Sequence, residues 1–328
     1  MFISGISIIY IILILVILIS LFCLVLYLTT EPYPEIRRSD EEILFFNSQT
    51  GQKERFPSLD EDWSVHLSII VPAYNEEERL PPMLDECLEY LEPRRKSGFT
   101  YEIIIVSDGS TDGTALVAQN YADKHDTIRI LILKKNRGKG GAVRLGIECA
   151  RGSLLLFADA DGATKFEDLE KLEESISEML HCDYKVEPDK VASMRAVVCG
   201  SRAHLEKEAT ANRSVFRLIL MHGFHFLVWL LCVKNVRDTQ CGFKLLTRES
   251  ARILFRALHI ERWAFDVELL YIAQTLKMPI SEIAVNWTEI EGSKLVPFWS
   301  WVQMGRDLGL IWLRYQIGAW KINAKKKS

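Results

Sequence analysis

The sequence lacks the cysteine spacing that a disulfide framework or a zinc site requires. Its seven cysteines are odd in number, lie far apart and nowhere form a Cys-x-x-Cys pair. This pattern indicates a reducing compartment. An excess of basic residues is also missing, because the formal net charge is −4, so the chain has no general attraction to nucleic acid. Internal repeats are absent, and low-complexity sequence is confined to the two ends of the chain.

Charged side chains are also missing from residues 1–30, where isoleucine, leucine and valine dominate. The 23 residues from Ile6 to Leu28 are long enough to cross about 30 Å of hydrocarbon as a helix. A cleaved signal peptide is the alternative, but the run is too long for one, no basic residues precede it and no Ala-x-Ala site ends it. The nearest basic residues, such as Arg37, Arg38 and Lys53, all follow the span. The positive-inside rule therefore predicts a single-pass anchor with the rest of the chain in the cytosol.

The rest of the chain alternates apolar, strand-like runs with helical segments. Strands are expected at 66–74, 101–110, 128–133, 153–158, 196–201 and 280–287, and helices at 77–91, 112–124, 139–150 and 166–180. This alternation predicts an α/β fold, with a mostly parallel sheet covered by helices on both faces. The 328 residues then divide into an anchor at 1–30, a linker at 31–64, one globular domain at 65–295 and a C-terminal amphipathic segment with a basic tail at 296–328.

Acidic residues follow two of the predicted strands at the point where each strand ends. Asp108 closes the second strand, and Asp159 and Asp161 follow the fourth. Parallel sheets place ligands at the carboxyl ends of their strands, and residues two apart in an extended chain point to the same side. Asp159 and Asp161 are therefore candidates to bind one Mg²⁺, which takes one or two carboxylates together with water and substrate phosphates. Asp112, in contrast, can equally serve as the cap of the next helix.

A glycine-rich segment, Asn136–Gly146, begins the third predicted helix. It is not a Walker loop, since Gly-x-x-x-x-Gly-Lys-[Ser/Thr] is absent, and Val143 breaks the dinucleotide-binding fingerprint. A flexible loop at a helix N-terminus that carries Arg137 and Lys139 suits an anionic phosphate. The alternative is a surface turn whose charges are solvated.

Six motifs occur in the order typical of the family 2 glycosyltransferases of GT-A fold, and they cover about residues 67–296. They are VPAYNEEERL (Val71–Leu80), VSDGSTDGT (Val106–Thr114), NRGKGGAVR (Asn136–Arg144), ADADGATKF (Ala158–Phe166), GSR (Gly200–Arg202) and DTQCGFK (Asp238–Lys244). The set resembles most the dolichyl-phosphate β-glucosyltransferase branch of that family. The resemblance implies transfer of glucose from UDP-glucose to dolichyl phosphate with inversion at the anomeric carbon, which provides lipid-linked glucose for protein N-glycosylation.

The resemblance assigns the nucleotide and its diphosphate to side chains at the strand ends and in two loops. These residues are Pro72, Tyr74, Glu76, Asp108, Lys139, Asp159 and Lys294. Asp159 and Asp161 would also bind Mg²⁺ or Mn²⁺. Relatives that transfer mannose often carry Gln two places after this metal motif, where this chain has Ala163, so that fewer protein ligands would surround the metal or Asp159 would act through water. For Lys294, a solvated loop lysine is the alternative.

The expected acceptor chemistry follows from the phosphate itself. A phosphate monoester is largely dianionic at neutral pH, since its second pKa is about 6, and it attacks the anomeric carbon without a general base. The enzyme then needs cations to hold the acceptor, and Arg202 is the first candidate because guanidinium offers two parallel donors. Arg213 and Arg217 are weaker candidates. The catalytic residues implied are the metal ligand Asp161, Arg202 and Asp266, although Asp266 can equally form a structural ion pair.

A lipid acceptor predicts membrane contact near the site. The uncharged stretch 218–233 fits a core helix as well as a membrane-embedded one. Residues 296–320 are rich in tryptophan with intermittent charges, as in an interfacial helix. The lysines of Ala324–Ser328 suit contact with anionic lipid, and this end resembles a dilysine retrieval signal. We therefore expect the protein in the endoplasmic reticulum membrane with its catalytic domain in the cytosol.

Three alternative functions compete with this one. A processive polysaccharide synthase carries Gln-x-x-Arg-Trp and a set of spanning helices, whereas this chain has His259 in place of Gln and no evident set of spans. A mannosyltransferase acting on the same lipid would differ only in a few pocket contacts. A non-catalytic membrane adaptor would have no need of Asp108, Asp161 and Arg202 together.

Overall fold

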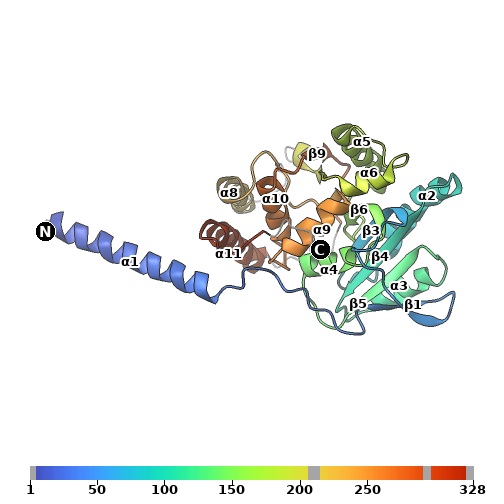
Figure 1. Cartoon of the computed structure of the whole chain (residues 1–328), viewed down its shortest axis with the longest axis horizontal. Helices are drawn as coiled ribbons and strands as arrows, with labels where there is room; N and C mark the ends of the chain where they lie inside the picture. Colours follow the sequence, from blue (N-terminus) through green and yellow to red (C-terminus); the bar gives the residue numbers. More distant parts are fainter. Residues whose placement is uncertain (1–4, 206–214, 291–296, 323–328) are drawn as a thin grey trace.

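The computed structural model describes residues 5–205, 215–290 and 297–322, and its central feature is a seven-stranded sheet (Figure 1). The sheet order is β5-β4-β3-β6-β8-β7-β9. The strands are β3 (Val65–Ala73), β4 (Tyr101–Asp108), β5 (Ile128–Leu133), β6 (Gly152–Ala158), β7 (Val197–Ser201), β8 (Phe243–Thr247) and β9 (Ile280–Ala284). Arg213, Lys294 and the Ala324–Ser328 tail, to which the sequence analysis assigned roles, lie outside the described residues.

Neighbouring strands of this sheet pair in parallel except at β8, which is antiparallel to both β6 and β7. The expected mostly parallel sheet is therefore confirmed, and all six expected strands are present. The sequence does not predict β8, because a charged residue, Lys244, interrupts its short apolar run. In the fold Lys244 is completely buried.

Helices cover both faces of the sheet, as the continuous apolar strands predict. Alternate residues of the strands point to opposite faces, so Ile69 and Ile70 belong to two separate cores. The Ile69 face is covered by α2 (Leu80–Lys96), α3 (Thr114–Ala122), α5 (Leu169–Leu180) and α6 (Pro188–Ser193). The Ile70 face is covered by α4 (Lys139–Ile147), α9 (Arg248–Ala257) and α10 (Phe265–Thr275).

The segment expected to be a plain linker is partly folded onto the domain. It contains a hairpin of β1 (Leu44–Asn47) and β2 (Gln52–Arg55). Phe45 of β1 and Phe56, which follows β2, are buried in the Ile70-face core and have ring centroids 4.9 Å apart. These two aromatic side chains hold the segment against the domain. The polar composition of the segment did not predict this packing.

The apolar helix α1 (Gly5–Thr29) projects from the domain with its side chains exposed (Figure 1). Its Ile8–Thr29 stretch has a mean hydropathy of 3.5, and within the described part of the chain it is the one helix long and apolar enough to cross a membrane. Just after it, the carbonyl of Pro32 accepts a hydrogen bond of 2.9 Å from the backbone N–H of Lys321. The start of the linker is thus bound to the C-terminal segment.

Two amphipathic helices, α8 (Val215–Leu231) and α11 (Pro297–Gln316), lie on the side of the domain that faces α1 (Figure 1). In α8, Val228 is buried whereas Trp229 is 53% exposed. In α11, Leu308 is buried and Trp312 is exposed. Each helix therefore packs one face on the domain and leaves apolar side chains exposed on the other. The α8 helix is thus partly a core helix and partly an exposed apolar surface.

Candidate active site

The acidic pair of the metal motif lies where β6 ends, next to the N-terminus of α4. The ammonium of Lys139, the first residue of α4, lies 2.6 Å from Oδ1 and 2.9 Å from Oδ2 of Asp159. Burial opposes the charge of Lys139, but Asp159 and Asp266 together hold its pKa above the ordinary value. The fold therefore places a largely buried cation, with a side chain 14% exposed, against the first carboxylate of the motif.

Asp159 is also fixed from the side of β8. Its backbone N–H donates to the carbonyl of Gly242 over 3.0 Å. A Cβ at Gly242 would lie 2.0 Å from Oδ2 of Asp159. A larger residue at position 242 would therefore displace the Asp159 carboxylate, a constraint that the sequence of the DTQCGFK motif did not indicate.

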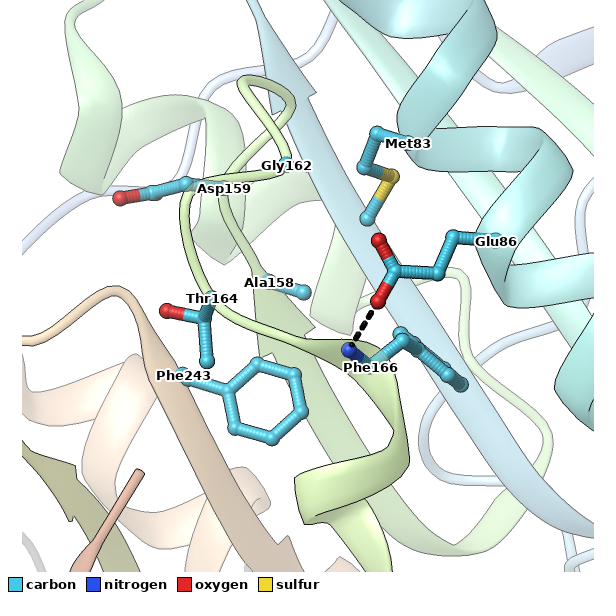
Figure 2. A pocket seen from close by; sticks show the side chains of 8 residues that line it. All are labelled: Met83, Glu86, Ala158, Asp159, Gly162, Thr164, Phe166 and Phe243. Carbon is cyan, nitrogen blue, oxygen red and sulfur yellow. Dashed lines mark hydrogen bonds between the residues drawn. The ribbon is translucent and has the colours of Figure 1, made fainter. Parts of the chain in front are cut away.

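Figure 2 shows the inner side of the same loop, where a cavity of about 10 Å³ lies under residues 158–166. Met83 and Glu86 of α2 face this cavity, and Oε1 of Glu86 accepts a hydrogen bond of 2.8 Å from the backbone N–H of Phe166. The Asp159 carboxylate points away from these two side chains. A cavity of this size holds about one water molecule, so it supports the loop and is too small to accept a substrate.

Asp161 stabilises the turn that follows it. Its Oδ1 accepts the backbone N–H of Ala163 over 3.0 Å, and Gly162 between them has φ 68°. Burial and the negative charge of Asp159 raise the pKa of Asp161. A cation bound between the two carboxylates would remove the repulsion that contributes to this shift.

Asp108, the last residue of β4, binds the backbone of the glycine-rich loop. Its two carboxylate oxygens accept the N–H groups of Arg137, at 2.7 Å, and Gly138, at 2.9 Å. Burial raises the pKa of Asp108 to about 6, although these two donors favour the charged form. The carboxylate expected to hold the nucleotide base is thus already positioned by the loop beside it.

The glycines of this loop are needed for close packing. A Cβ at Gly140 would lie 2.6 Å from Cβ of Phe265, and one at Gly138 would lie 2.9 Å from the carbonyl oxygen of Glu261. The same carbonyl accepts the N–H of Gly141 over 2.9 Å. The loop therefore packs against the start of α10, a contact that accounts for its glycines independently of any phosphate.

The loops that follow β3 and β4 are interlocked. Oδ1 of Asn75, a residue with φ 55°, accepts the N–H of Thr111 over 2.8 Å. Asp112 accepts the N–H of Thr114, the first residue of α3, over 3.0 Å, which agrees with its capping role. These bonds fix two strand ends of the expected nucleotide site at a constant separation.

The three remaining candidates at the end of β3 have different environments. Pro72 lies in the strand itself, paired in register with Val106 of β4. Tyr74 is 38% exposed at the edge of the sheet. The carboxylate of Glu76 is buried and forms an ion pair of 2.6 Å with Arg79. Tyr74 is therefore accessible to a ligand, whereas Glu76 is engaged by its neighbour.

Arg202 follows β7 and is held by an acidic partner that the sequence reading did not single out. Its Nε and Nη2 donate to the two oxygens of Asp238 over 2.7 and 2.9 Å. Its guanidinium also lies 5.4 Å from the ring centroid of Trp287. Its third nitrogen, Nη1, has no hydrogen-bond partner among the residues that the structure describes.

Asp266, in the first turn of α10, forms a buried ion pair with Lys244 of β8. The ammonium lies 2.5 Å from Oδ1 of Asp266 and donates to the carbonyl of Cys241 over 2.8 Å. Burial raises the pKa of Asp266, against the effect of Lys244 and Lys139. The sequence allowed either a catalytic role or an ion pair for Asp266, and the ion pair is present.

Asp159 and Asp161 have the donor chemistry that Mg²⁺ or Mn²⁺ requires. Hard divalent cations bind carboxylate oxygens and retain positions for water and substrate phosphates. No third acidic, histidine or cysteine side chain joins the pair within the described ranges. The residues present therefore fit a cation held by two carboxylates and completed by a diphosphate.

The fold and the site together define a GT-A transferase. A similar arrangement of the chain is found in glucosyl-3-phosphoglycerate synthase from Mycobacterium tuberculosis, in a structure with phosphoglyceric acid. The two share a TM-score of 0.52 and 16% identity, over 78% of this chain and 81% of the other. At this identity the likeness supports the fold alone.

The sequence comparisons are more specific. The family model for glycosyl transferase family 2 matches residues 68–187. The Drosophila melanogaster dolichyl-phosphate β-glucosyltransferase is 58% identical, over 94% of this chain and 93% of its own length. The Homo sapiens protein of the same name is 57% identical over equal shares, and the Saccharomyces cerevisiae one is 38% identical over 93% and 92%. The chain belongs to the dolichyl-phosphate β-glucosyltransferases of glycosyltransferase family 2.

Proposed function

We propose that this protein transfers glucose from UDP-glucose to dolichyl phosphate, with inversion, to give dolichyl β-D-glucosyl phosphate. The observation that carries the proposal is the convergence of Asp159, Asp161 and Lys139 at the carboxyl edge of the sheet. Relatives of the same family, similar over nearly the whole chain, carry the name of this activity. The product would serve as the lipid-linked glucose donor for protein N-glycosylation.

The donor nucleotide would lie across the ends of β3 and β4. The exposed ring of Tyr74 offers a stacking surface, and Asp108 offers a carboxylate acceptor for an N–H of the base. The interlocked loops keep this surface rigid, because Asn75 joins the two strand ends. Rigid positioning of the donor lowers the entropic cost of reaching the reactive geometry.

Asp159 and Asp161 would hold Mg²⁺ or Mn²⁺ against the diphosphate. A bound cation supplies positive charge that stabilises UDP as it leaves. Lys139 adds a second positive charge on the same side, and its attachment to Asp159 fixes where that charge lies. The chain thus orients the leaving group with two carboxylates and one ammonium.

Arg202 would hold the acceptor phosphate. Its Nη1 is the nitrogen that remains for a phosphate oxygen, while Asp238 orients the guanidinium through the other two. One phosphate oxygen forms a bond to the anomeric carbon from the face opposite to UDP, and the bond from that carbon to the UDP oxygen breaks. No proton has to be removed from a dianionic phosphate, so Asp266, buried against Lys244, is expected to act by positioning.

The location follows from α1 and the charges after it. The basic residues Arg37, Arg38, Lys53 and Arg55 follow the apolar span, which favours a catalytic domain on the cytosolic side of the membrane. The choice of the endoplasmic reticulum rests on the family to which the chain belongs. A cytosolic domain leaves the Asn286-Trp287-Thr288 pattern unglycosylated. A decrease in the mass of the natural protein after treatment with an N-glycosidase would show a glycan and contradict this orientation.

The test uses purified full-length protein in detergent with Mg²⁺ and dolichyl phosphate. Radiolabelled UDP-glucose and GDP-mannose are offered separately, and label is counted in the lipid phase. We expect label from UDP-glucose alone, lost with a chelator and in Asp161→Ala. Label from GDP-mannose alone would overturn the sugar assignment, and no label from either would overturn the proposed reaction. The NMR coupling of the anomeric proton in the intact lipid product, compared with that of the α-linked donor, establishes inversion.

A further inference from the structure

A polar groove of about 750 Å³ adjoins the site described above, because Asn136 and Arg137 of the glycine-rich loop line it. Its walls come from the linker, the turn after β5, the segment before α10 and the middle of α11. Its basic side chains are Arg37, Lys134, Lys135, Arg137, Arg262 and Arg306. The volume is in the range of small-molecule sites.

Basic groups outnumber acidic ones in this groove by six to three. The carboxylates are Glu42, Glu261 and Asp307, and each forms an ion pair with an arginine. Lys135 and Arg262 form no ion pair with any described residue. Arg37 and Lys134 pair with Glu35 and Glu41, which lie outside the lining. The positive charge available to a ligand therefore comes mainly from the two unpaired cations, and it favours an anionic ligand.

Buried polar atoms beside the groove also lack partners. His259, which lines it, has a side chain only 7% exposed. Its Nδ1 lies 3.1 Å from Oε1 of Glu268, but its Nε2 is buried without a hydrogen-bond partner. Nε and Nη2 of the buried Arg144, which pairs with Glu261 of the groove wall at 3.5 Å, are in the same situation. Because these nitrogens have almost no accessible surface, a ligand in the groove would be held by its exposed cations and not by these atoms.

The groove lies close to the membrane anchor. Arg37 is eight residues beyond the last residue of α1, Thr29. The hydrogen bond from Lys321 to Pro32 keeps the start of the linker against the C-terminal segment that follows α11. Basic groups within a Debye length of an anionic leaflet are attracted to it.

The groove is also separate from the proposed acceptor side. Lys134 and Lys135 follow β5 at one edge of the sheet, whereas Arg202 follows β7. Five strand spacings of about 4.8 Å separate β5 from β7, or roughly 24 Å along the sheet. A ligand at the turn after β5 therefore does not occupy the place assigned to dolichyl phosphate.

We propose that this groove binds the phosphate-bearing headgroup of an anionic phospholipid of the membrane in which α1 is anchored. The phosphate would be held by Lys135 and Arg262, the two unpaired cations of the groove. The proposal rests on α1 being a membrane anchor and is independent of which sugar the enzyme transfers. Occupation of the groove would fix the orientation of the domain against the bilayer.

The test measures lipid binding by the full-length protein in micelles of an uncharged detergent. The probes are short-chain phosphatidylinositol, short-chain phosphatidylcholine and inorganic phosphate, each titrated by calorimetry. The groove variant is Lys135→Gln/Arg262→Gln. The matched control is Lys96→Gln/Lys124→Gln, which removes the same charge from two exposed lysines outside the groove.

We expect phosphatidylinositol to bind and phosphatidylcholine to bind much more weakly. Each basic group near an anionic lipid contributes about 1 kcal/mol, so losing two weakens binding roughly thirtyfold, while the control keeps the natural affinity. Equal loss in the control, or no binding by any lipid, would overturn the proposal. Inorganic phosphate binding as tightly as the lipid would assign the groove to a soluble phosphate compound instead. Competition by UDP or by a polyprenyl phosphate would assign it to the active site.

A parallel measurement keeps this inference apart from the proposed reaction. Glucose transfer to dolichyl phosphate is assayed in uncharged detergent with the natural protein and the groove variant. Transfer at the natural rate together with weakened lipid binding supports a separate lipid site. Loss of transfer in the groove variant, with its lipid binding unchanged, contradicts the assignment.

Discussion

Lys244→Met tests the buried ion pair beneath the active site most directly. The Lys244 side chain is 0% exposed and its Asp266 partner 3% exposed, with 2.5 Å between ammonium and carboxylate. The ammonium also lies 5.2 Å from the ring centroid of Phe157 and donates to Cys241. Methionine nearly matches the volume of lysine but removes the charge, so Asp266 remains buried without its counter-ion.

Removing one partner of a buried ion pair costs about 3–5 kcal/mol, because the other charge stays uncompensated. We expect the free energy of unfolding of Lys244→Met, measured by urea titration of the detergent-solubilised protein, to fall by that amount. Lys190→Met is the control. It breaks a surface pair in which Lys190 and Glu187 are 52% and 49% exposed, and we expect it to leave the unfolding free energy unchanged.

The double variant Lys244→Met/Asp266→Leu separates stability from chemistry. Replacing a buried ion pair by apolar groups of similar volume is often neutral or stabilising, so most of the lost free energy should return. If Asp266 contributes to the reaction by positioning, glucose transfer stays low in this stable double variant. Lys244→Arg keeps both Asp266 and a positive charge beside it, so this variant should retain partial transfer. A loss of stability in Lys244→Met no greater than that of the Lys190→Met control would refute the reasoning from burial.

Three further changes probe the site. Gly242→Ala would place a Cβ against the Asp159 carboxylate. If the carboxylate moves by about 1 Å, turnover should fall roughly a hundredfold. The control Gly309→Ala, whose Cβ would have no atom within 4 Å, should leave turnover unchanged. The affinity for UDP should fall as the pH drops through about 6, because the pKa of Asp108 is raised to about 6 and its carboxylate becomes protonated there. In Asp108→Asn the affinity should depend less on pH. An affinity of the natural protein that does not change with pH would contradict a role for the charge of Asp108. Arg202→Lys removes one charge-assisted hydrogen bond worth about 1.5–3 kcal/mol and should raise KM for dolichyl phosphate at least tenfold at constant KM for UDP-glucose; an equal rise in both would contradict the acceptor role.

Apolar periodicity determined most of this fold. A continuous apolar strand such as 153–158 must be buried on both faces, and the helices that flank it in the sequence follow from that requirement. The anchor follows from the uncharged residues 1–30, since only a helix satisfies backbone groups in hydrocarbon. The positions of Asp108, Asp159 and Asp161 at strand ends follow from the same pattern, because parallel strands end at one edge.

Tertiary structure decided which charges meet. Spacing along the chain did not indicate that Lys139 contacts Asp159 across 20 residues, or that Lys244 contacts Asp266 across 22. The second pair depends on the insertion of β8 between β6 and β7. The sequence does not predict this strand, because a lysine interrupts its apolar run. The sequence by itself therefore determines the elements and the edge at which polar groups gather, since burial of apolar side chains is a local property of each segment. Which acid pairs with which base depends on contacts between distant segments, and these exist only once the sheet has formed.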